Sequence, residues 1–192
     1  LPFHSYAQPT NDACGSAFPL TPSVSCNTGA LKTNTGIATA TNGINAFCGG
    51  STASPDVWYS FEAQSAYPVI TLRNMGNNMD NTPKLQLFNT TSCTAVTLNS
   101  SSIACASGTN TTSLTLNTST ALGGAGLTVG TIYLIRVFTN ETIAANGSAN
   151  GWDFTICVTN PPANDLCTNA ISLNSSATCS PTSGTLNAAT TY

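Results

Sequence analysis

Apolar and polar residues alternate in short runs along most of the chain, and Gly, Pro, Asn and Ser separate these runs. A period of two predicts β-strands, because successive side chains of a strand point to opposite faces of its sheet. The pattern is clear in residues 56–63, 67–73, 84–88, 112–116, 130–138 and 151–158, and weaker in 36–40, 95–98 and 103–105. Such a series of short strands predicts an all-β fold: an antiparallel β-sandwich of the jelly-roll or immunoglobulin-like kind.

Helical periodicity is poor throughout. One helical turn is expected at Asn11 and Asp12, because either side chain can accept a hydrogen bond from a free N–H group at a helix start. No apolar run reaches the ~18 residues that a membrane-spanning helix needs, so we expect no membrane span.

A short phrase occurs twice in the chain. Residues 9–20 read PTNDACGSAFPL and residues 162–173 read PANDLCTNAISL, with shared positions moved from 11 to 164 and from 14 to 167, an offset of 153. A repeat at such a period indicates a modular chain. We expect residues 9–160 to form one module, and residues 161–192 to be a proline joint followed by the opening of a second, truncated repeat.

Charged residues are scarce. Four Lys plus Arg and seven Asp plus Glu make up 6% of the chain, against about 25% in typical soluble domains. A net charge of −3 with so few basic side chains provides no electrostatic footprint for nucleic acid and no polybasic patch for a membrane surface.

The chain contains eight cysteines and one histidine, His4. No two cysteines are two to four residues apart, which disfavours a zinc site. Cysteines at this frequency predict disulfides, and disulfides indicate an oxidising compartment. We therefore expect a secreted, cell-surface-associated protein. Six of the cysteines fall into pairs that are twelve residues apart: Cys14 and Cys26, Cys93 and Cys105, and Cys167 and Cys179.

The pairing of these cysteines is only partly suggested by their spacing. We expect a bridge between Cys93 and Cys105 across two short strands. Local closure of the first pair would leave Cys48 with Cys157. The alternative joins Cys14 or Cys26 to the later cysteines, and the six cysteines of the module allow 15 connectivities in all.

Residues 1–8 precede the first copy of the phrase and have no counterpart before the second. Ser5 and Ala7 match the small-x-small rule for signal-peptide cleavage, with Gln8 as the first mature residue. We expect a signal-peptide remnant here, and the alternative is an ordinary N-terminal extension.

Four motifs in order resemble a known family. PDVWYSF (residues 55–61), KLQLFNTTSC (84–93), LTVGTIYLIRVF (127–138) and the repeated PxNDxCxxA opening are similar to pre-peptidase C-terminal-like β-sandwich modules. These modules occur in large secreted and surface proteins of Bacteroidota-type bacteria. The resemblance covers nearly all of residues 9–158. It implies a compact β-sandwich, export through the outer membrane, tandem arrangement in adhesin-like or hydrolase-associated proteins, and no active site.

Candidate chemistry is sparse. Nucleophilic catalysis by a Ser or Cys needs a histidine base, and His4 lies in the N-terminal extension, so we expect no enzyme. A two-carboxylate site would have to draw on Asp56, Glu62, Asp80, Glu141 and Asp153, which are residues that strand ends and loops of any sandwich contain. No cofactor is expected, with calcium as the one candidate.

Two binding sites are conceivable from residue type. Asp80 with Asn77 and Asn78 could supply oxygen ligands to calcium, and the alternative is a hydrogen-bonded Asx turn. Trp58 and Trp152 could stack on glycan rings, although strand alternation places at least half of such aromatic residues in the core.

Two functions follow from these observations. The first is a non-catalytic structural or adhesive module of an extracellular surface protein or fibre, whose partners are neighbouring copies of the module or subunit and surface glycans. In a sharper form of that hypothesis residues 162–192, the tail, pack on the next subunit as an intermolecular strand. The tail residues concerned are Pro162, Asn164, Asp165 and Leu173. The alternative is a carbohydrate-binding accessory domain of a secreted hydrolase.

Overall fold

The computed structural model describes residues 8–26, 31–34, 38–45, 47–49, 54–140, 151–165, 167–184, 186 and 189. The predicted signal-peptide remnant therefore lies outside the described residues, except for Gln8. Part of the candidate strand at 36–40 and the candidate carboxylate Glu141 also lie outside them.

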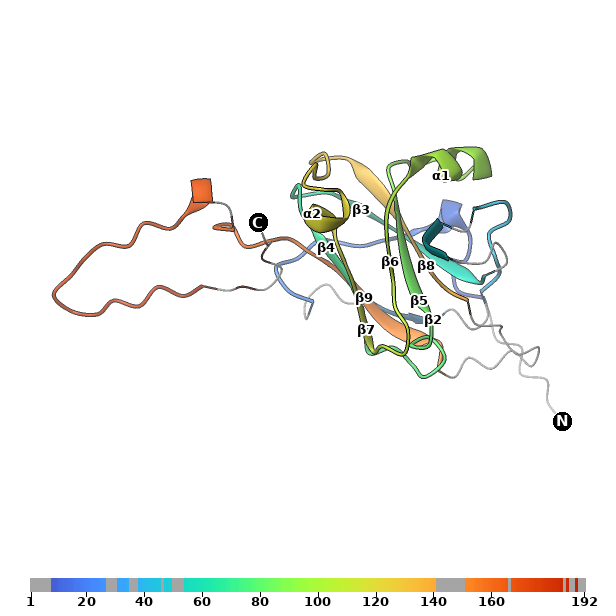
Figure 1. Ribbon diagram of the computed structural model, residues 1–192, viewed down its shortest axis with the longest axis horizontal. Helices are drawn as coiled ribbons and strands as arrows, with labels where there is room; N and C mark the ends of the chain where they lie inside the picture. Colours follow the sequence, from blue (N-terminus) through green and yellow to red (C-terminus); the bar gives the residue numbers. More distant parts are fainter. Residues whose placement is uncertain are drawn as a thin grey trace.

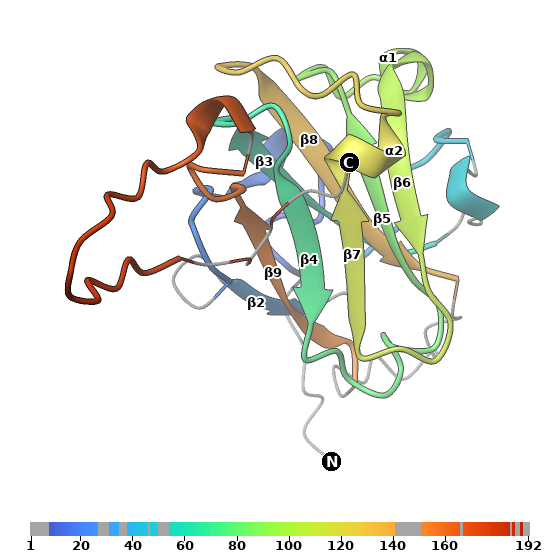
Figure 2. The same cartoon turned by 60° about the vertical axis from the view of Figure 1, so that its left-hand side comes forward.

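The described strands form two sheets that pack face to face as a β-sandwich (Figure 1). The five-stranded sheet has the order β1-β3-β8-β5-β6, and the four-stranded sheet, which is in front in Figure 2, has the order β2-β9-β4-β7. The first sheet consists of β1 Phe18–Pro19, β3 Asp56–Glu62, β5 Pro83–Phe88, β6 Ser102–Ser107 and β8 Ile132–Thr139. The second consists of β2 Leu31–Asn34, β4 Val69–Arg73, β7 Ser113–Asn117 and β9 Asp153–Thr159. The predicted β-sandwich is confirmed.

Neighbouring strands pair antiparallel with one exception. The register of β3 on β8 runs from Asp56↔Phe138 to Glu62↔Ile132, and β4 lies between β7 and β9. The exception is β1, which pairs parallel to β3 at the edge of the five-stranded sheet. The short β1 is contributed by the N-terminal segment, which we define as residues 9–26.

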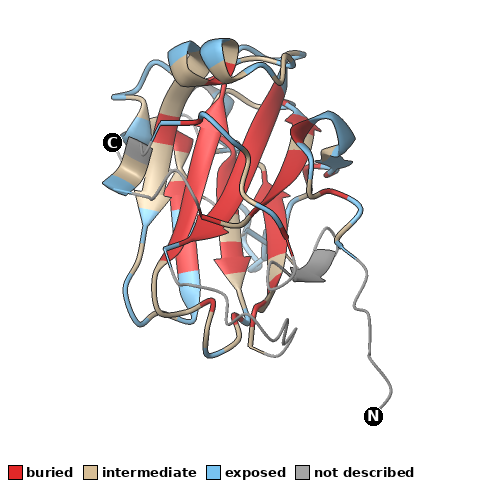
Figure 3. Ribbon diagram, turned by 90° about the vertical axis from the view of Figure 1, so that its right-hand side faces the viewer, coloured by how far each residue is buried: buried red, intermediate tan, exposed pale blue. Residues whose placement is uncertain are grey.

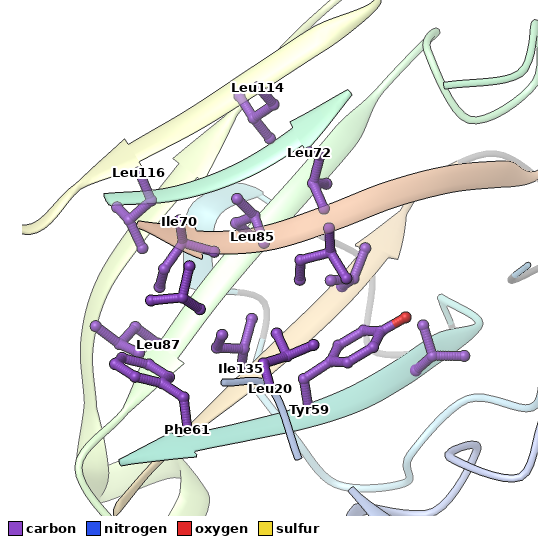
Figure 4. Close-up of a cluster of buried hydrophobic side chains, with 14 of the residues drawn as sticks. Leu20, Tyr59, Phe61, Ile70, Leu72, Leu85, Leu87, Leu114, Leu116 and Ile135 are labelled. Carbon is purple, nitrogen blue, oxygen red and sulfur yellow. The ribbon is translucent and has the colours of Figure 1, made fainter. Parts of the chain in front are cut away.

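The main core lies between the sheets, as the buried central strands in Figure 3 show. Side chains of both sheets meet there, among them Tyr59 and Phe61 from β3 and Ile70 and Leu72 from β4 (Figure 4). Each fully buried large apolar side chain contributes roughly 1.5–3 kcal/mol relative to its exposed state. Leu20 of the N-terminal segment joins this core and is 6% exposed.

A second, smaller core covers the outer face of the five-stranded sheet. It contains Cys14, Ile44, Trp58, Phe88, Leu98 and Leu134. Helix α1 (Ala95–Ser101) and the 3-10 helix η1 (Cys14–Ser16) contribute to it. Strand alternation explains the two cores, because Trp58 points away from the face that carries Tyr59 and Phe61.

Helix α1 corrects a prediction, because residues 95–98 were expected to form a strand. The hydroxyl of Thr94 accepts a hydrogen bond from the N–H of Thr97 at 3.3 Å and so caps the helix start. Within the helix Leu98 is buried. The apolar and polar alternation of residues 95–98 is therefore due to one side chain that faces the core, and not to a β-strand. The remaining short helices are α2 Thr118–Ala121, η2 Phe47–Gly49 and η3 Cys167–Asn169.

No helix in the described part of the chain has the length and apolar character to cross a membrane.

Candidate functional site: the anchored N-terminal segment

The first copy of the repeated phrase is bound to the edge of the five-stranded sheet. The side-chain amide of Asn11 donates to the carbonyl of Trp58 at 2.9 Å, and the N–H of Trp58 donates to the carbonyl of Asn11 at 2.9 Å. Asn11 thus satisfies both backbone groups of a fully buried strand residue, groups that would otherwise lose hydrogen bonds on burial. Asn11 itself is 5% exposed.

Asp12 binds a loop that precedes β3. Its two carboxylate oxygens accept hydrogen bonds from the N–H of Thr39 at 2.5 Å and the hydroxyl of Thr39 at 2.7 Å. The expectation that Asn11 or Asp12 caps a helix is wrong, because the residue before η1 is Ala13 and makes no side-chain cap. Both polar side chains instead fasten distant segments to one another.

The rest of the N-terminal segment crosses from one sheet to the other. Phe18 pairs with Tyr59, and the N–H of Leu20 donates to the carbonyl of Ser60 at 2.7 Å. Ser23 then forms an isolated parallel bridge with Thr159 of β9. Its N–H donates to Val158 at 3.0 Å and its carbonyl accepts from Asn160 at 2.8 Å. Residues 18–23 thereby connect β3 of the five-stranded sheet with β9 of the four-stranded sheet.

Two disulfides fix the ends of this crossing. Cys14 is bonded to Cys93 and Cys26 to Cys157, with Cα atoms 5.7 Å and 5.5 Å apart. The former bond lies at the outer core, and the latter reaches β9 of the four-stranded sheet. The N-terminal segment is therefore covalently attached to the sandwich at both ends of its path.

The third disulfide joins Cys48 of η2 to Cys105 of β6. The expected Cys93–Cys105 bridge is wrong, because residues 95–101 form α1 and not the first strand of a hairpin. Local closure of Cys14 with Cys26, and the pair Cys48–Cys157 that it implied, are also wrong, because residues 18–23 are extended between the two sheets. The alternative that joins Cys14 and Cys26 to later cysteines is the one the structure contains.

A buried ion pair lies next to the anchored segment. The carboxylate of Asp56 accepts from Nε of Arg136 at 2.6 Å and from the hydroxyl of Thr41 at 2.7 Å. The Arg136 guanidinium lies 4.3 Å from the centre of the Phe138 ring. Burial raises the pKa of Asp56 and lowers the pKa of Arg136, while the attraction between the two groups opposes both shifts. Both side chains are fully buried, and they serve the fold.

The two candidate glycan-stacking residues are both in the interior, which overturns that prediction. Trp58 is 0% exposed and Trp152 is 5% exposed. The indole N–H of Trp58 is directed at Thr41 Oγ1, 3.0 Å away, and Asp56 Oδ1, 3.2 Å away. Neither ring offers a face to a sugar in this structure.

The candidate calcium loop packs closely on the backbone of Gly151. The N–H groups of Asn78 and Met79 donate to the carbonyl of Gly151 at 2.8 and 2.9 Å. Gly151 has a φ of +81°, and the side-chain oxygen of Asn77 lies too close to its Cβ position for a side chain to fit there. Among the described residues no three His, Cys, Asp or Glu side chains are grouped as metal ligands would be. Calcium binding through Asp80, Asn77 and Asn78 stays a prediction.

The second copy of the phrase lies in a long loop that extends away from the sandwich (Figure 1). Cys167 and Cys179 are exposed and unpaired, so the structure does not contain the local disulfide that their spacing allowed. Leu173, which corresponds to the buried Leu20, is 73% exposed. The assembly role predicted for Pro162, Asn164, Asp165 and Leu173 thus concerns side chains that are open to solvent or partly so.

Several residues of this site were not predicted from the sequence, and Ser23 is the one that could most easily have been identified. Ser23 recurs as Ser176 at the same offset of 153, from 23 to 176, and this repeat could have marked it. Asp56 and Arg136 also carried a signal. They are charged residues inside strongly apolar strands, in a chain where charge is rare.

Similarity to known proteins is found among solved structures. No protein-family model matches the chain, and no curated protein matches it. Among solved structures, the chain is similar to the pre-peptidase C-terminal domain of collagenase from Bacillus anthracis. The similarity has a TM-score of 0.40 and 11% sequence identity, and covers 74% of this chain and 93% of that one. A likeness of this size carries no argument about activity or ligand.

Proposed function

We propose that this chain is a non-catalytic structural and adhesive module of an extracellular surface protein or fibre. Its sandwich holds the N-terminal segment by hydrogen bonds and two disulfides, and a second copy of that segment follows the last strand. The three disulfides suit an oxidising environment and support placement outside the cell.

The observation that carries this proposal is the difference between the two copies of the repeated phrase: the first is bound to the sandwich and the second is not bound in that way. Residues 9–26 are bound to both sheets, whereas those of the matching residues 162–179 whose burial the structure describes are exposed or half-buried after β9. A segment that completes one sandwich and recurs beyond it is a means of joining sandwiches in series. Assembly of modules is therefore the function that best fits the chain.

Binding and catalytic roles have less support. The carboxylate of Asp56 is buried against Arg136 and is not accessible to a substrate in solution. The two tryptophans that suggested a glycan-binding accessory domain are buried as well.

Imaging of native material tests the proposal. Extracellular material from cells that express the chain would be labelled with an antibody against it and examined by electron microscopy. We expect the label on fibres or surface layers, at regular intervals comparable to the length of one sandwich. Label confined to a soluble hydrolase would overturn the proposal.

A glycan array distinguishes the structural role from the alternative function, a carbohydrate-binding accessory domain. The full chain should give no saturable signal on polysaccharides if its role is structural. Saturable binding to one polysaccharide, together with a soluble distribution, would favour the carbohydrate-binding accessory domain. Turnover in a broad hydrolase screen would contradict the non-catalytic assignment.

A further inference from the structure

The described residues of the second copy share local backbone hydrogen bonds with the first, although none of them pairs with a strand as residues of the first copy do. In the first copy the N–H of Asp12 donates to Pro9 at 3.1 Å, and the N–H of Ala17 donates to Cys14 at 3.1 Å. In the second copy the equivalent bonds join Asp165 to Pro162 at 3.0 Å and Ala170 to Cys167 at 3.2 Å.

The correspondence continues along both copies. Each contains a 3-10 helix at the cysteine, Cys14–Ser16 in one and Cys167–Asn169 in the other. Further on, the hydroxyl of Ser23 donates to the carbonyl of Ser25, and that of Ser176 donates to the carbonyl of Thr178. These local contacts are thus present in a copy whose described residues pair with no strand.

The first copy binds the sandwich through certain of its side chains, and the corresponding side chains of the second copy are exposed to solvent. Asn164 and Cys167 are exposed, Cys179 is exposed, and Leu173 is 73% exposed. Exposed Leu and two exposed thiols are unfavourable features of a tail unless another surface covers them.

We propose that residues 162–179, which we call the C-terminal segment, dock on a second sandwich body of the same construction that follows in sequence. Two disulfides formed by Cys167 and Cys179 lock this contact. The proposal rests on the proposed function and adds to it the identity of the partner and the chemistry of the joint.

The first copy specifies what the receiving body must present. It needs a buried strand residue whose N–H and carbonyl are open at a sheet edge, as those of Trp58 are toward Asn11. It needs an apolar slot for Leu173. It also needs two cysteines, one placed like Cys93 before a helix and one placed like Cys157 on the second sheet.

The body described in this structure cannot be the receiver. Its β3 edge is paired with β1, and its Cys93 and Cys157 are already bonded to the N-terminal segment. The C-terminal segment therefore requires a body whose edge is not yet occupied. A body that follows residues 162–179 in sequence, as residues 27–160 follow residues 9–26, meets this requirement.

The covalent step is thiol oxidation by a disulfide oxidant of the oxidised glutathione class. For each bond, the thiols of the C-terminal segment and of the receiving body lose two hydrogens and form one S–S bond. One oxidised glutathione is reduced to two glutathione molecules in the same process.

A tandem protein tests the proposal. It consists of the full chain followed by a second copy of residues 40–160. At the offset of 153, residues 180–192 take the place of residues 27–39, so residue 40 is the next one needed. The protein is refolded with reduced and oxidised glutathione. We expect Cys167 and Cys179 to bond to the appended copies of Cys93 and Cys157. Both thiols should then be lost from maleimide labelling, and peptide mapping without reduction should identify both bonds. In the unextended chain both cysteines should stay reactive.

Two further proteins keep the outcome interpretable. In the positive control, residues 162–179 of the tandem are replaced by the sequence of residues 9–26, which binds such a body in this structure. In the matched variant, Asn164→Ala and Leu173→Ala remove the hydrogen bond and the apolar anchor, and we expect at least a severalfold lower yield of the two bonds.

The proposal is overturned if the positive control pairs correctly while the native tandem does not. It is also overturned if Cys167 bonds to Cys179, or if both bond to a second molecule, which would make the partner a neighbouring subunit. None of these failures would affect the imaging and glycan tests of the structural function. Label on a soluble hydrolase would overturn that function even if the tandem pairs as expected.

Discussion

Asn11 and the backbone of Trp58 are joined by two hydrogen bonds of opposite direction, each 2.9 Å long: the side-chain amide of Asn11 donates to the carbonyl of Trp58, and the backbone carbonyl of Asn11 accepts from the N–H of Trp58. One asparagine in this way provides the partner that a neighbouring strand would give to an edge residue. From Tyr59, the residue after Trp58, the contact continues as strand pairing, with Phe18 opposite Tyr59. The anchored segment is thus part of the sheet and not an appendage to it.

Replacing Asn11 by Ala is expected to lower the free energy of unfolding by about 1–3 kcal/mol, because it leaves the buried Trp58 carbonyl without its partner. Urea denaturation with the disulfides intact would measure the loss. The matched control is Asn164→Ala, which alters an exposed residue and should change stability by no more than about 0.5 kcal/mol. Equal effects of the two substitutions would contradict the difference between the copies.

Removing the Cys14–Cys93 bond is expected to cost about 2–5 kcal/mol. The test is the double variant Cys14→Ser with Cys93→Ser, compared with Cys167→Ser, which alters an exposed thiol and should be neutral. Mapping of the untreated protein by mass spectrometry should find Cys14–Cys93, Cys26–Cys157 and Cys48–Cys105. Recovery of a Cys93–Cys105 peptide pair would refute this connectivity.

Breaking the Asp56–Arg136 ion pair from either side should be costly. Asp56→Asn or Arg136→Met alone is expected to destabilise the fold by roughly 3–5 kcal/mol, because each leaves a buried group without its counterpart. The double variant should lose clearly less than the sum of the two. Thermal denaturation of the four proteins gives the coupling, and strict additivity would show that the two groups act independently.

The contact between Gly76 and Gly151 should not tolerate a methyl group. A Cβ atom at Gly76 would lie 2.5 Å from the Gly151 carbonyl carbon, so Gly76→Ala is expected to cost about 1–3 kcal/mol or more through overpacking. Gly15→Ala is the control, because no atom lies within 4 Å of its Cβ position. That variant should be unchanged or slightly more stable, and comparable losses would argue against the close packing.

The sheets were predictable because their strands alternate strongly. The strand predicted at residues 56–63 corresponds to β3, Asp56–Glu62, and the one predicted at 130–138 corresponds to β8, Ile132–Thr139. Burial of one face enforces this period. In contrast, β1 has two residues, Phe18–Pro19, and is too short to show any period. Its pairing is determined by contacts with residues far away in sequence.

The site was harder to predict, because its partners are brought together by tertiary structure. The repeat identified Asn11, Asp12 and Cys14 as important, and the structure shows that they bind Trp58, Thr39 and Cys93. No local signal links residue 12 to residue 39. The twelve-residue cysteine spacing was misleading, since Cys93 precedes α1 and bonds to Cys14, whereas Cys105 lies within β6 and bonds to Cys48.

The Cys26–Cys157 bond has a mechanical consequence for a protein pulled from both ends. The two cysteines are 131 residues apart in sequence, and the bond passes tension directly from the segment before the sandwich to the strand that leaves it. The chain between the two cysteines has a contour length of about 450 Å at ~3.5 Å per residue, and it cannot be extended while the bond is intact. Such a unit would give way by bond rupture or reduction, and not by unravelling.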